Sequence, residues 1–355
     1  MKKFKYLFIV LLVSLLFSSC LEEMELDETL LTPKIAVSTF LNPNNSIYIK
    51  LMHDIPVNQE NNGWNGVPDA NVTLYEDGKK VTELKKLPYY DYSYNNYGEK
   101  PIILDTSYHY MAADKYPQPG KTYQLEVESE TYGSIRTETT VPFPVQINKV
   151  ESVVEEKQTD NYRYNQLNFK VRFTDPADEE NYYRILLHKI EGKLDNWKDS
   201  TDQTIYINNT QSGLKLYTED NIFFYEKENA NSFVVGETDN NYGIFTDETI
   251  NGKEYELKFS ITMNPVELDT TVGEFFAYRI ELQSITKDMY YYLKSIDQQE
   301  IMYQFPFSEP IPVYSNVENG IGVLGSYSSS AYPVFYGQYP KDGVVYDTEY
   351  EFYNE

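Results

Sequence analysis

Apolar and polar residues alternate along most of the chain, in short runs that end at Asn, Gly, Asp or Pro. The clearest run covers residues 169–173, Phe-Lys-Val-Arg-Phe, and it stops at Asp175-Pro176. A period of two residues is typical of a strand with one buried face, and the Asp-Pro pair is typical of a turn. We therefore expect strands through most of the chain.

Residues 70–81 predict a β-hairpin. Val72, Leu74 and Val81 are its apolar positions, and Asp77-Gly78 supplies the two turn residues. Both positions of such a turn need a positive φ, which Asp and Gly tolerate better than most residues. The 35 tyrosines of the chain agree with a fold built of strands, because aromatic rings pack well on a pleated surface.

A short internal repeat indicates two related units. Gly-Lys-Thr-Tyr-Gln-Leu-Glu-Val at 120–127 recurs as Gly-Lys-Glu-Tyr-Glu-Leu-Lys-Phe at 252–259. Each copy predicts a glycine turn followed by a strand. The tyrosine of each copy resembles the corner tyrosine of immunoglobulin-like sandwiches, whose hydroxyl bonds to nearby backbone.

The segment Val-Pro-Phe-Pro-Val at 141–145 predicts the domain boundary, because its two prolines restrict the backbone to extended conformations. We expect an immunoglobulin-like β-sandwich over residues 34–145. Residues 146–355 then form a second β-rich domain. With roughly 336 residues after a cleaved leader, the chain is long enough for two domains, each with a core of its own.

One helix is predicted near residues 286–301. Thr286 can cap it, Asp288 lies in its first turn, and Met289, Leu293 and Ile296 fall on one face together with Tyr292. We expect this helix to pack against a sheet. The predicted fold class is therefore mainly all-β, with two β-sandwich domains, the first immunoglobulin- or fibronectin-like and the second larger, with one packing helix.

The N-terminus predicts an export signal over residues 1–19. Three lysines precede the apolar run 6–17, and Ser18, Ser19 and Cys20 follow it. As a helix, twelve residues reach about 18 Å, well short of a hydrocarbon core of roughly 30 Å. The alternative is ordinary cleavage after Ser19, but Phe17 occupies a position where that pattern has a small residue. Cys20 is the predicted lipidation site, since acyl chains on it would hold the protein at a membrane.

Residues 20–33 are expected to be the lipidated cysteine and a flexible acidic tether. Leu21-Glu22-Glu23 resembles the acidic surface-export signal of Bacteroidota lipoproteins, and the alternative is a solvated tether without an address. The expected location is the outer membrane, with the lipid-anchored protein facing the cell exterior rather than the periplasm.

The net charge and the cysteine content exclude some classes of partner and of bonding within the fold. Loss of residues 1–19 removes three lysines and no acidic residue, so the net charge of -25 becomes -25 - 3 = -28. Such a charge repels polyanions, and we expect no nucleic-acid partner. Cys20 is the only cysteine, which excludes disulfides and thiolate metal sites within the fold.

The motif Gly-Ile-Gly-Val-Leu-Gly at 320–325 matches the dinucleotide fingerprint, which requires a strand before it and a helix after it. A segment rich in Ser and Tyr follows instead, so we interpret the glycines as turns or bulges and predict no cofactor.

No enzyme class is indicated by the remaining candidates. His53, His109 and His188 lie far apart and form no compact ligand pattern. A pair of carboxylates for a hydrolase remains an alternative among 55 acidic residues. The acidic cluster within residues 175–180 has oxygen ligands suited to calcium but no EF-hand pattern, and solvated surface is the simpler interpretation. We expect a protein that is not an enzyme and has no metal site.

Several motifs carry a family resemblance. Residues 307–325, from Phe-Ser-Glu-Pro through Ser-Asn-Val-Glu-Asn-Gly to Gly-Val-Leu-Gly, resemble the signature of the Bacteroidota lipoprotein family known as domain of unknown function 4249 (DUF4249). Asp175-Pro176 followed by residues 181–184 and the segment 291–295 resemble two further family segments; Leu324 stands where the family more often has an aromatic residue. The resemblance implies an N-terminal immunoglobulin-like domain, a second β-rich domain and association with TonB-dependent transporters of the outer membrane. It supplies no catalytic residues.

The expected function is therefore that of a non-catalytic, surface-exposed lipoprotein that is an accessory of such a transporter or binds a ligand. A tyrosine-rich loop is the candidate surface for a glycan or peptide ligand, and its tyrosines packing on their own sheet is the alternative. The candidate ligand-binding residues are Tyr90, Tyr92, Tyr94 and Tyr97. Two other functions remain open: a structural or assembly component of an envelope complex, and a carboxylate-dependent hydrolase.

Overall fold

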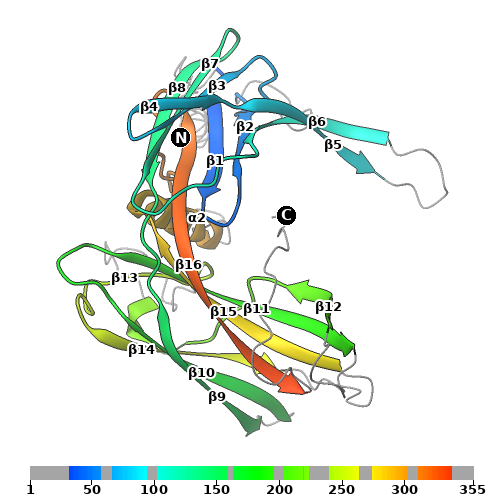
Figure 1. Cartoon of the computed structure of the whole chain (residues 1–355), viewed down its shortest axis with the longest axis vertical. Helices are drawn as coiled ribbons and strands as arrows, with labels where there is room; N and C mark the ends of the chain where they lie inside the picture. The colour runs from blue at the N-terminus through cyan, green and yellow to red at the C-terminus, as the bar shows by residue number, and fades with distance from the viewer. Residues whose placement is uncertain are drawn as a thin grey trace, which may run out of the picture. The chain divides into compact units, whose positions relative to one another are not determined.

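The computed structural model describes residues 32–56, 66–93, 102–158, 163–195, 204–218, 220–223, 240–263, 274–302 and 311–337. All of these residues except Thr32, Pro33, Ile55 and Pro56 belong to one compact unit. Within that unit the structure is mainly β, with three sheets and one α-helix among the described residues (Figure 1). The predicted fold class is thereby confirmed.

The first sandwich contains a four-stranded antiparallel sheet in the order β4-β3-β7-β8. Its strands are β3 (Asn71–Glu76), β4 (Lys79–Glu83), β7 (Thr122–Ser129) and β8 (Gly133–Thr140). The predicted hairpin is confirmed, because β3 and β4 are joined by Asp77 and Gly78 at φ values of 48° and 75°. Glycine and a short polar residue suit this turn since neither pays the full steric cost of a positive φ.

A nine-stranded sheet carries the rest of the first sandwich and half of the second. Its order is β12-β11-β15-β16-β1-β2-β6-β5, with β13 paired to β11. The strands are β1 (Ile35–Leu41), β2 (Ile47–His53), β5 (Lys85–Ser93), β6 (Ile102–Ala112), β11 (Tyr182–Asp195), β12 (Thr204–Gln211), β13 (Ile244–Thr246), β15 (Glu274–Ile285) and β16 (Ile321–Gly337).

Strand β16 belongs to both sandwiches. Residues 321–326 pair in parallel with β1, and residues 327–337 pair in antiparallel with β15. In Figure 1 the orange β16 accordingly runs from the side of the blue β1 to the side of the yellow β15. One continuous strand of 17 residues therefore ties the two sandwiches together through backbone hydrogen bonds.

A third sheet, in the order β14-β10-β9, faces the β11-β15 part of the long sheet. Its strands are β9 (Ile147–Gln158), β10 (Arg163–Thr174) and β14 (Glu254–Met263). Phe169, Val171 and Phe173 of β10 are at most 1% exposed, whereas Lys170 is exposed. The predicted alternation at residues 169–173 is thus confirmed, with the apolar face turned to the core.

The core has three parts among the described residues. Residues from β1, β2, β3 and β7 fill the first, to which Val317 and Leu324 of the C-terminal region also contribute. The second lies between the β14-β10-β9 sheet and the inner face of β11 and β15. Val141 is buried in the first core and Val145 in the second, so the predicted connection is anchored at both ends. The domain boundary at residue 145 stays a prediction.

The third part of the core is formed around helix α2 (Lys287–Met302). The Oγ1 atom of Thr286 accepts a hydrogen bond from the Met289 amide at 3.4 Å, which confirms the predicted cap. Met289 and Leu293 are buried as expected, and Tyr290 is buried beside them. The helix packs on the outer face of the long sheet, where Tyr182 of β11 and Ile285 of β15 contribute to the same cluster.

The segment Asn221–Phe223 forms one 3₁₀ turn, whose Phe223 packs in the second core. None of the described helices is long and apolar enough to span a bilayer.

Candidate functional site

The sequence-predicted site residues fall largely outside the described side chains. Cys20, Tyr94 and Tyr97 lie outside the described residues. The backbones of Tyr90 and Tyr92 belong to strand β5 and pair with Thr106 and Ile103 of β6, although we expected a loop there. The difference has a simple origin, since tyrosines alternating with small polar residues are as typical of a strand as of a binding loop.

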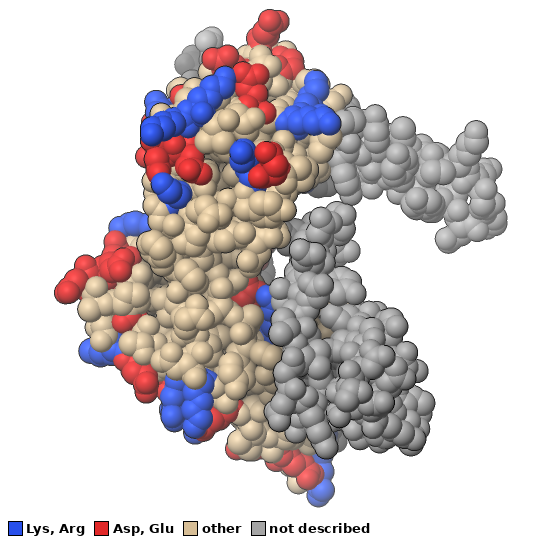
Figure 2. Space-filling view, viewed as in Figure 1, with Lys and Arg blue, Asp and Glu red and all other residues tan. Residues whose placement is uncertain are grey.

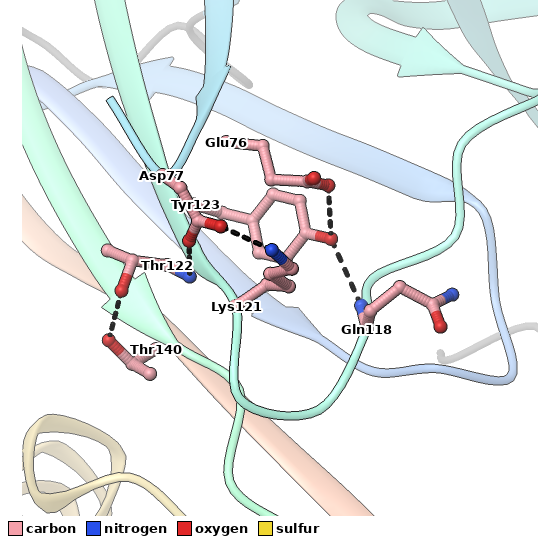
Figure 3. Close-up of polar contacts among 7 residues, drawn as sticks. All are labelled: Glu76, Asp77, Gln118, Lys121, Thr122, Tyr123 and Thr140. Atoms are coloured by element: carbon pink, nitrogen blue, oxygen red, sulfur yellow. Dashed lines mark hydrogen bonds and ion pairs between the residues drawn. The ribbon is translucent and has the colours of Figure 1, made fainter. Parts of the chain in front are cut away.

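The corner tyrosine predicted in the first copy of the repeat is confirmed (Figure 3). Tyr123 is 1% exposed, and its hydroxyl accepts a hydrogen bond from the Gln118 amide at 3.0 Å. The same hydroxyl donates to Oε2 of Glu76 at 2.8 Å. Burial, with the nearby Glu76 carboxylate, raises the pKa of Tyr123 to about 12, so the hydroxyl stays protonated. Tyr123 therefore fixes the turn that leads into β7.

The second copy keeps the strand but uses its tyrosine differently. The hydroxyl of Tyr255 donates to Oδ1 of Asp220 at 2.5 Å and has no backbone partner among the described residues. Burial and this carboxylate raise the pKa of the phenol. Asp220 also accepts a hydrogen bond from the Lys258 amide at 3.3 Å. The two tyrosines occupy the same position in the repeat, but they form hydrogen bonds with different neighbouring segments.

The segment that carries the family signature holds β16 in place through one asparagine. Asn316 Oδ1 accepts a hydrogen bond from the Leu324 amide at 3.0 Å, and its Nδ2 donates to the Leu324 carbonyl at 3.0 Å. Nδ2 also donates to Oδ2 of Asp288 at 3.1 Å, next to the start of α2. Thr137 of β8 donates to the Asn316 carbonyl at 3.1 Å. Asn316 thus links β16, β8 and the helix.

The glycines of the same signature allow β16 to lie close to β1. Gly322 has a φ of 90°, and a Cβ atom there would lie 2.0 Å from the Val37 carbonyl oxygen. Gly325 approaches Met289 and Phe40 closely enough that a Cβ would stand 2.9 Å from each. The motif leads into a strand rather than a helix, so it lacks the helix N-terminus that a dinucleotide needs. Its glycines serve close strand packing.

A cleft of about 350 Å³ opens beside this signature. Arg136, Thr137, Glu138, Asp288, Asn316 and Glu318 line it. Both oxygens of Asp288 are engaged, Oδ1 by the Tyr314 hydroxyl at 2.5 Å and Oδ2 by Asn316. Arg136 and Glu318 also pair through their backbones. A polar cleft whose side chains hold one another offers little apolar surface to a ligand, and we interpret it as a structural junction.

A second group of polar residues lies on the outer face of the second sandwich, opposite the core. On β11 and β15, Tyr183, Ile185, Leu187, Tyr278, Ile280 and Leu282 face the core. The intervening residues face outward, because side chains alternate along a strand. We call this outward group the charged face, and it consists of Arg184, His188, Arg279, Glu281, Gln283 and Tyr327.

The register of β11 and β15 places the residues of the charged face in rows that run across the two strands. Arg184 of β11 lies directly opposite Gln283 of β15, and His188 lies opposite Arg279. Glu281 occupies the row between them. Although an outer face is normally hydrated, Glu281 and His188 are each 8% exposed and Gln283 is 3% exposed. Charged groups are rarely this buried unless they are paired.

Glu281 is held as an anion by its neighbours. Burial opposes its charge, but Nε2 of His188 lies 3.3 Å away and Gln283 Nε2 donates to Oε1 at 2.9 Å. The guanidinium of Arg279 adds a further contact at 3.8 Å. Together these groups lower the pKa of Glu281 to about 2. The carboxylate is therefore charged at every physiological pH.

Arg184 stands at the partly exposed end of the charged face. Its Nε donates to the Tyr242 carbonyl at 3.0 Å, and its guanidinium lies 5.9 Å from the centroid of the Tyr242 ring. Loss of hydration lowers the pKa of this guanidinium, whereas Tyr327 and Glu281 oppose that shift. The Tyr242 hydroxyl in turn donates to Glu300 of α2 at 3.0 Å, which fixes the ring.

The acidic residues within 175–180, which were considered as calcium ligands, contact different parts of the structure. Asp175 accepts hydrogen bonds from the Tyr183 hydroxyl at 2.5 Å and the Gly252 amide at 2.9 Å. Glu180 instead pairs with Lys287 at 3.0 Å. In the described ranges, no group of three or more His, Cys, Asp or Glu side chains is arranged to hold a metal ion.

The remaining histidines also have separate surroundings. His53 stacks on Tyr132 with ring centroids 4.6 Å apart, and its Nδ1 contacts the Asp54 carbonyl at 2.8 Å. His109 of β6 contacts the Tyr48 hydroxyl of β2. His53 and His109 lie on the neighbouring strands β2 and β6 but contact different residues, and His188 lies on β11.

Most charges on the described surface are interspersed. In Figure 2 blue and red side chains lie next to one another over β3, β4 and β8, where ion pairs such as Lys121–Asp77 at 2.5 Å are found. Such exposed pairs contribute little to stability. The charged face is different because His188, Glu281 and Gln283 are buried.

Sequence reasoning did not single out the charged face. On β15 its polar residues Arg279, Glu281 and Gln283 recur at every second position, and on β11 Arg184 and His188 flank Leu186, which is close to the ordinary pattern of a solvated outer face. Only the burial of Glu281 and Gln283, which depends on tertiary structure, marks the face as unusual.

Two comparisons with known proteins bear on this arrangement. The model of one protein family, described as a domain of unknown function (DUF4249), matches residues 22–332. A search of curated proteins found no match to the chain.

Proposed function

The chain belongs to the DUF4249 family, and we propose that it is a non-catalytic binding protein, anchored by lipid in the outer membrane and associated with a TonB-dependent transporter. The anchor in this proposal is Cys20, which follows a basic and then apolar N-terminal segment. The acidic residues Glu22 and Glu23 after it support display on the cell exterior.

The observation that supports a binding role rather than a catalytic one is that the buried carboxylates are occupied by hydrogen bonds within the protein. Among the described residues, the buried carboxylates are Asp175, Asp247, Glu281 and Asp297. Each accepts hydrogen bonds from neighbouring parts of the chain, from the Tyr183 hydroxyl or from Asn251, Gln283 and Asn241 amides. A general acid or base needs a pKa near the working pH and an open position for substrate. A carboxylate with a pKa of about 2, as in Glu281, suits electrostatic positioning instead. Burial raises the pKa of Asp175, but the Tyr183 hydroxyl and the Gly252 amide occupy its two oxygens and leave no open position.

The lipid anchor is tested by replacing Cys20. The Cys20→Ser protein should leave the membrane fraction or keep its N-terminal segment uncleaved, whereas Ser19→Ala, the matched control, should fractionate like the wild type. Mass spectrometry of the N-terminal peptide gives the second measurement, since acylation adds a defined mass. If Cys20→Ser is processed and remains with the membranes, the anchor proposal is wrong.

The transporter partnership is tested by affinity purification from detergent-solubilised outer membranes. The tagged protein should co-purify with a TonB-dependent transporter, and deletion of its gene should reduce uptake of that transporter's substrate. The Cys20→Ser protein serves as the control, because a released protein should recover less transporter. Absence of any transporter from the purified complex, with uptake unchanged on deletion, would refute the partnership.

A role as an assembly component is the second candidate, and the β5–β6 ribbon favours it. Strand β2 pairs with β6 only at residues 108–112, while β5 pairs with β6 from residue 102 onward. Residues 102–107 of β6 therefore have β5 as their only strand partner in the described part of the chain. Figure 1 shows the two strands continuing past β2. A two-stranded ribbon is marginally stable alone in water, so a partner strand would stabilise it.

A photo-crosslinking experiment distinguishes this second role. A photoreactive amino acid at Tyr92 of β5 should capture an envelope protein in cells, and the same group at Thr73 of β3 is the control. Equal labelling at the two positions would count against assembly through the ribbon.

A further inference from the structure

Among the described residues, the charged face contains more positive than negative charge. Arg184 and Arg279 contribute two guanidinium groups, whereas Glu281 is the carboxylate that contacts this group of residues. The surplus is unexpected in a chain with a net charge of -25, where acidic residues outnumber basic ones by 55 to 30. A partly buried arginine normally has a carboxylate or phosphate beside it, because desolvation of an unpaired charge is costly.

Arg184 has no such partner within the described residues. Its one hydrogen bond goes from Nε to the Tyr242 carbonyl, which leaves the two terminal nitrogens of the fork without a carboxylate. Glu281 pairs with His188 and Arg279 instead. The Arg184 side chain is also partly exposed, so a ligand can reach it from solvent.

The residue opposite Arg184 also has an unused hydrogen-bonding atom. Gln283 is 3% exposed and donates through Nε2 to Glu281, but its Oε1 has no hydrogen-bond partner among the described residues. A buried acceptor without a donor is unfavourable, because it has lost its hydration without gaining a protein partner. The direct pairing of the two residues in the register brings a free guanidinium fork and a free amide oxygen to neighbouring positions.

We propose that the charged face binds a small ligand that carries a carboxylate and a neighbouring hydroxyl group, with Arg184 holding the carboxylate. The planar fork of arginine matches the two oxygens of a carboxylate. The hydroxyl donates to Oε1 of Gln283, which completes the hydrogen bonding of that side chain. Acidic sugars and other hydroxy acids have this chemistry.

The rest of the charged face positions these two groups. Glu281 holds the Gln283 amide from one side and is itself held by His188, so Oε1 is directed away from that pair. The ring of Tyr242 lies against the guanidinium and is fixed by Glu300 of α2. The Tyr327 phenol lies close enough to Arg184, Arg279 and Glu281 to respond to their charges. The site is thus pre-organised on two strands and a helix.

Isothermal titration of the full-length protein in detergent tests the proposal. The probes are D-galacturonate and D-glucuronate, with D-galactose and D-glucose as neutral counterparts and sodium sulfate as a simple anion. At least one uronate should bind at least tenfold more tightly than its neutral counterpart. Arg184→Met should weaken that binding tenfold or more, since it removes a charge-assisted pair.

Arg172→Met is the matched control, because Arg172 lies on β10 and pairs with Glu256 at 2.7 Å on a different sheet. It should bind the uronate like the wild type. Arg184→Lys keeps the charge without the fork, and an intermediate loss is expected if Arg184→Met fails to fold. The proposal is overturned if neither uronate binds, if binding survives Arg184→Met, or if sulfate binds as tightly as the uronate. The titration needs no transporter, so its failure leaves the transporter partnership standing.

Discussion

Replacement of the corner tyrosine by phenylalanine should destabilise the first sandwich locally and strongly. Tyr123→Phe removes the hydroxyl that accepts from the Gln118 amide at 3.0 Å and donates to Glu76 at 2.8 Å. A hydrogen bond to a charged group is worth about 1.5–3 kcal/mol, and a neutral bond adds about 0.5–1.5 kcal/mol. Since the ring itself remains in place, the free energy of unfolding should fall by about 2–4 kcal/mol.

Hydrogen exchange measured by mass spectrometry is the suitable assay, because it reports the stability of β7 separately from the second sandwich. Peptides that cover residues 118–129 should exchange roughly 30 to 700 times faster in Tyr123→Phe, following the tenfold change per 1.4 kcal/mol. Tyr255→Phe is the matched control. It loses only the bond to Asp220 and should accelerate exchange in β14, leaving β7 unchanged. Unchanged exchange of β7 in Tyr123→Phe would refute the role assigned to the corner.

Two further predictions concern the signature and the charged face. Gly322→Ala should prevent correct pairing of β16 with β1, because its Cβ would lie 2.0 Å from the Val37 carbonyl oxygen. The control, Gly78→Ala, has open space around the new Cβ and should lower the free energy of unfolding by only about 1 kcal/mol, because of its positive φ. Thermal melts that show equal losses of stability for the two variants would contradict this. Glu281, with a pKa near 2 in the fold against 4.5 as its ordinary value, should contribute up to about 3 kcal/mol of stability above pH 4.5, lost as the pH falls toward 2. Glu281→Gln should flatten the stability of the protein over that range in urea titrations, and an unchanged slope would show that the His188–Glu281 pair is unimportant.

Much of the fold could be predicted from local pattern. The strand at residues 169–173, the turn at Asp77-Gly78 and the cap at Thr286 each depend on neighbours a few residues away, so the sequence contains the necessary information. The pairing of β1 with β16 could not be predicted, because it joins the two ends of the described chain and leaves no mark on either segment alone.

The charged face could not be predicted for a related reason. A lone Arg or Glu on the polar side of an alternating strand, such as Arg184 or Glu281, looks the same in sequence whether water or protein covers it. The family resemblance does not mark the charged face as a group either, because its densest motif lies at residues 307–325 and only Arg184 of the face falls within a resembling segment, residues 181–184. Tyr90 and Tyr92 stand out by composition alone, and composition does not separate a binding strand from an ordinary one.

The position of the signature explains why it identifies the family without indicating a ligand. Asn316 bonds the backbone of Leu324, and Gly322 permits the close approach to Val37, at the point where β16 passes from one sandwich to the other. A substitution there would disturb both sandwiches at once, because a single strand belongs to both sheets. Arg184 and Gln283 of the charged face lie on β11 and β15, so a change in either side chain leaves the backbone pairing of β16 with β1 intact. Specificity in this architecture is therefore expected on the charged face, whereas the signature fixes the crossing of β16 and does not indicate what is bound.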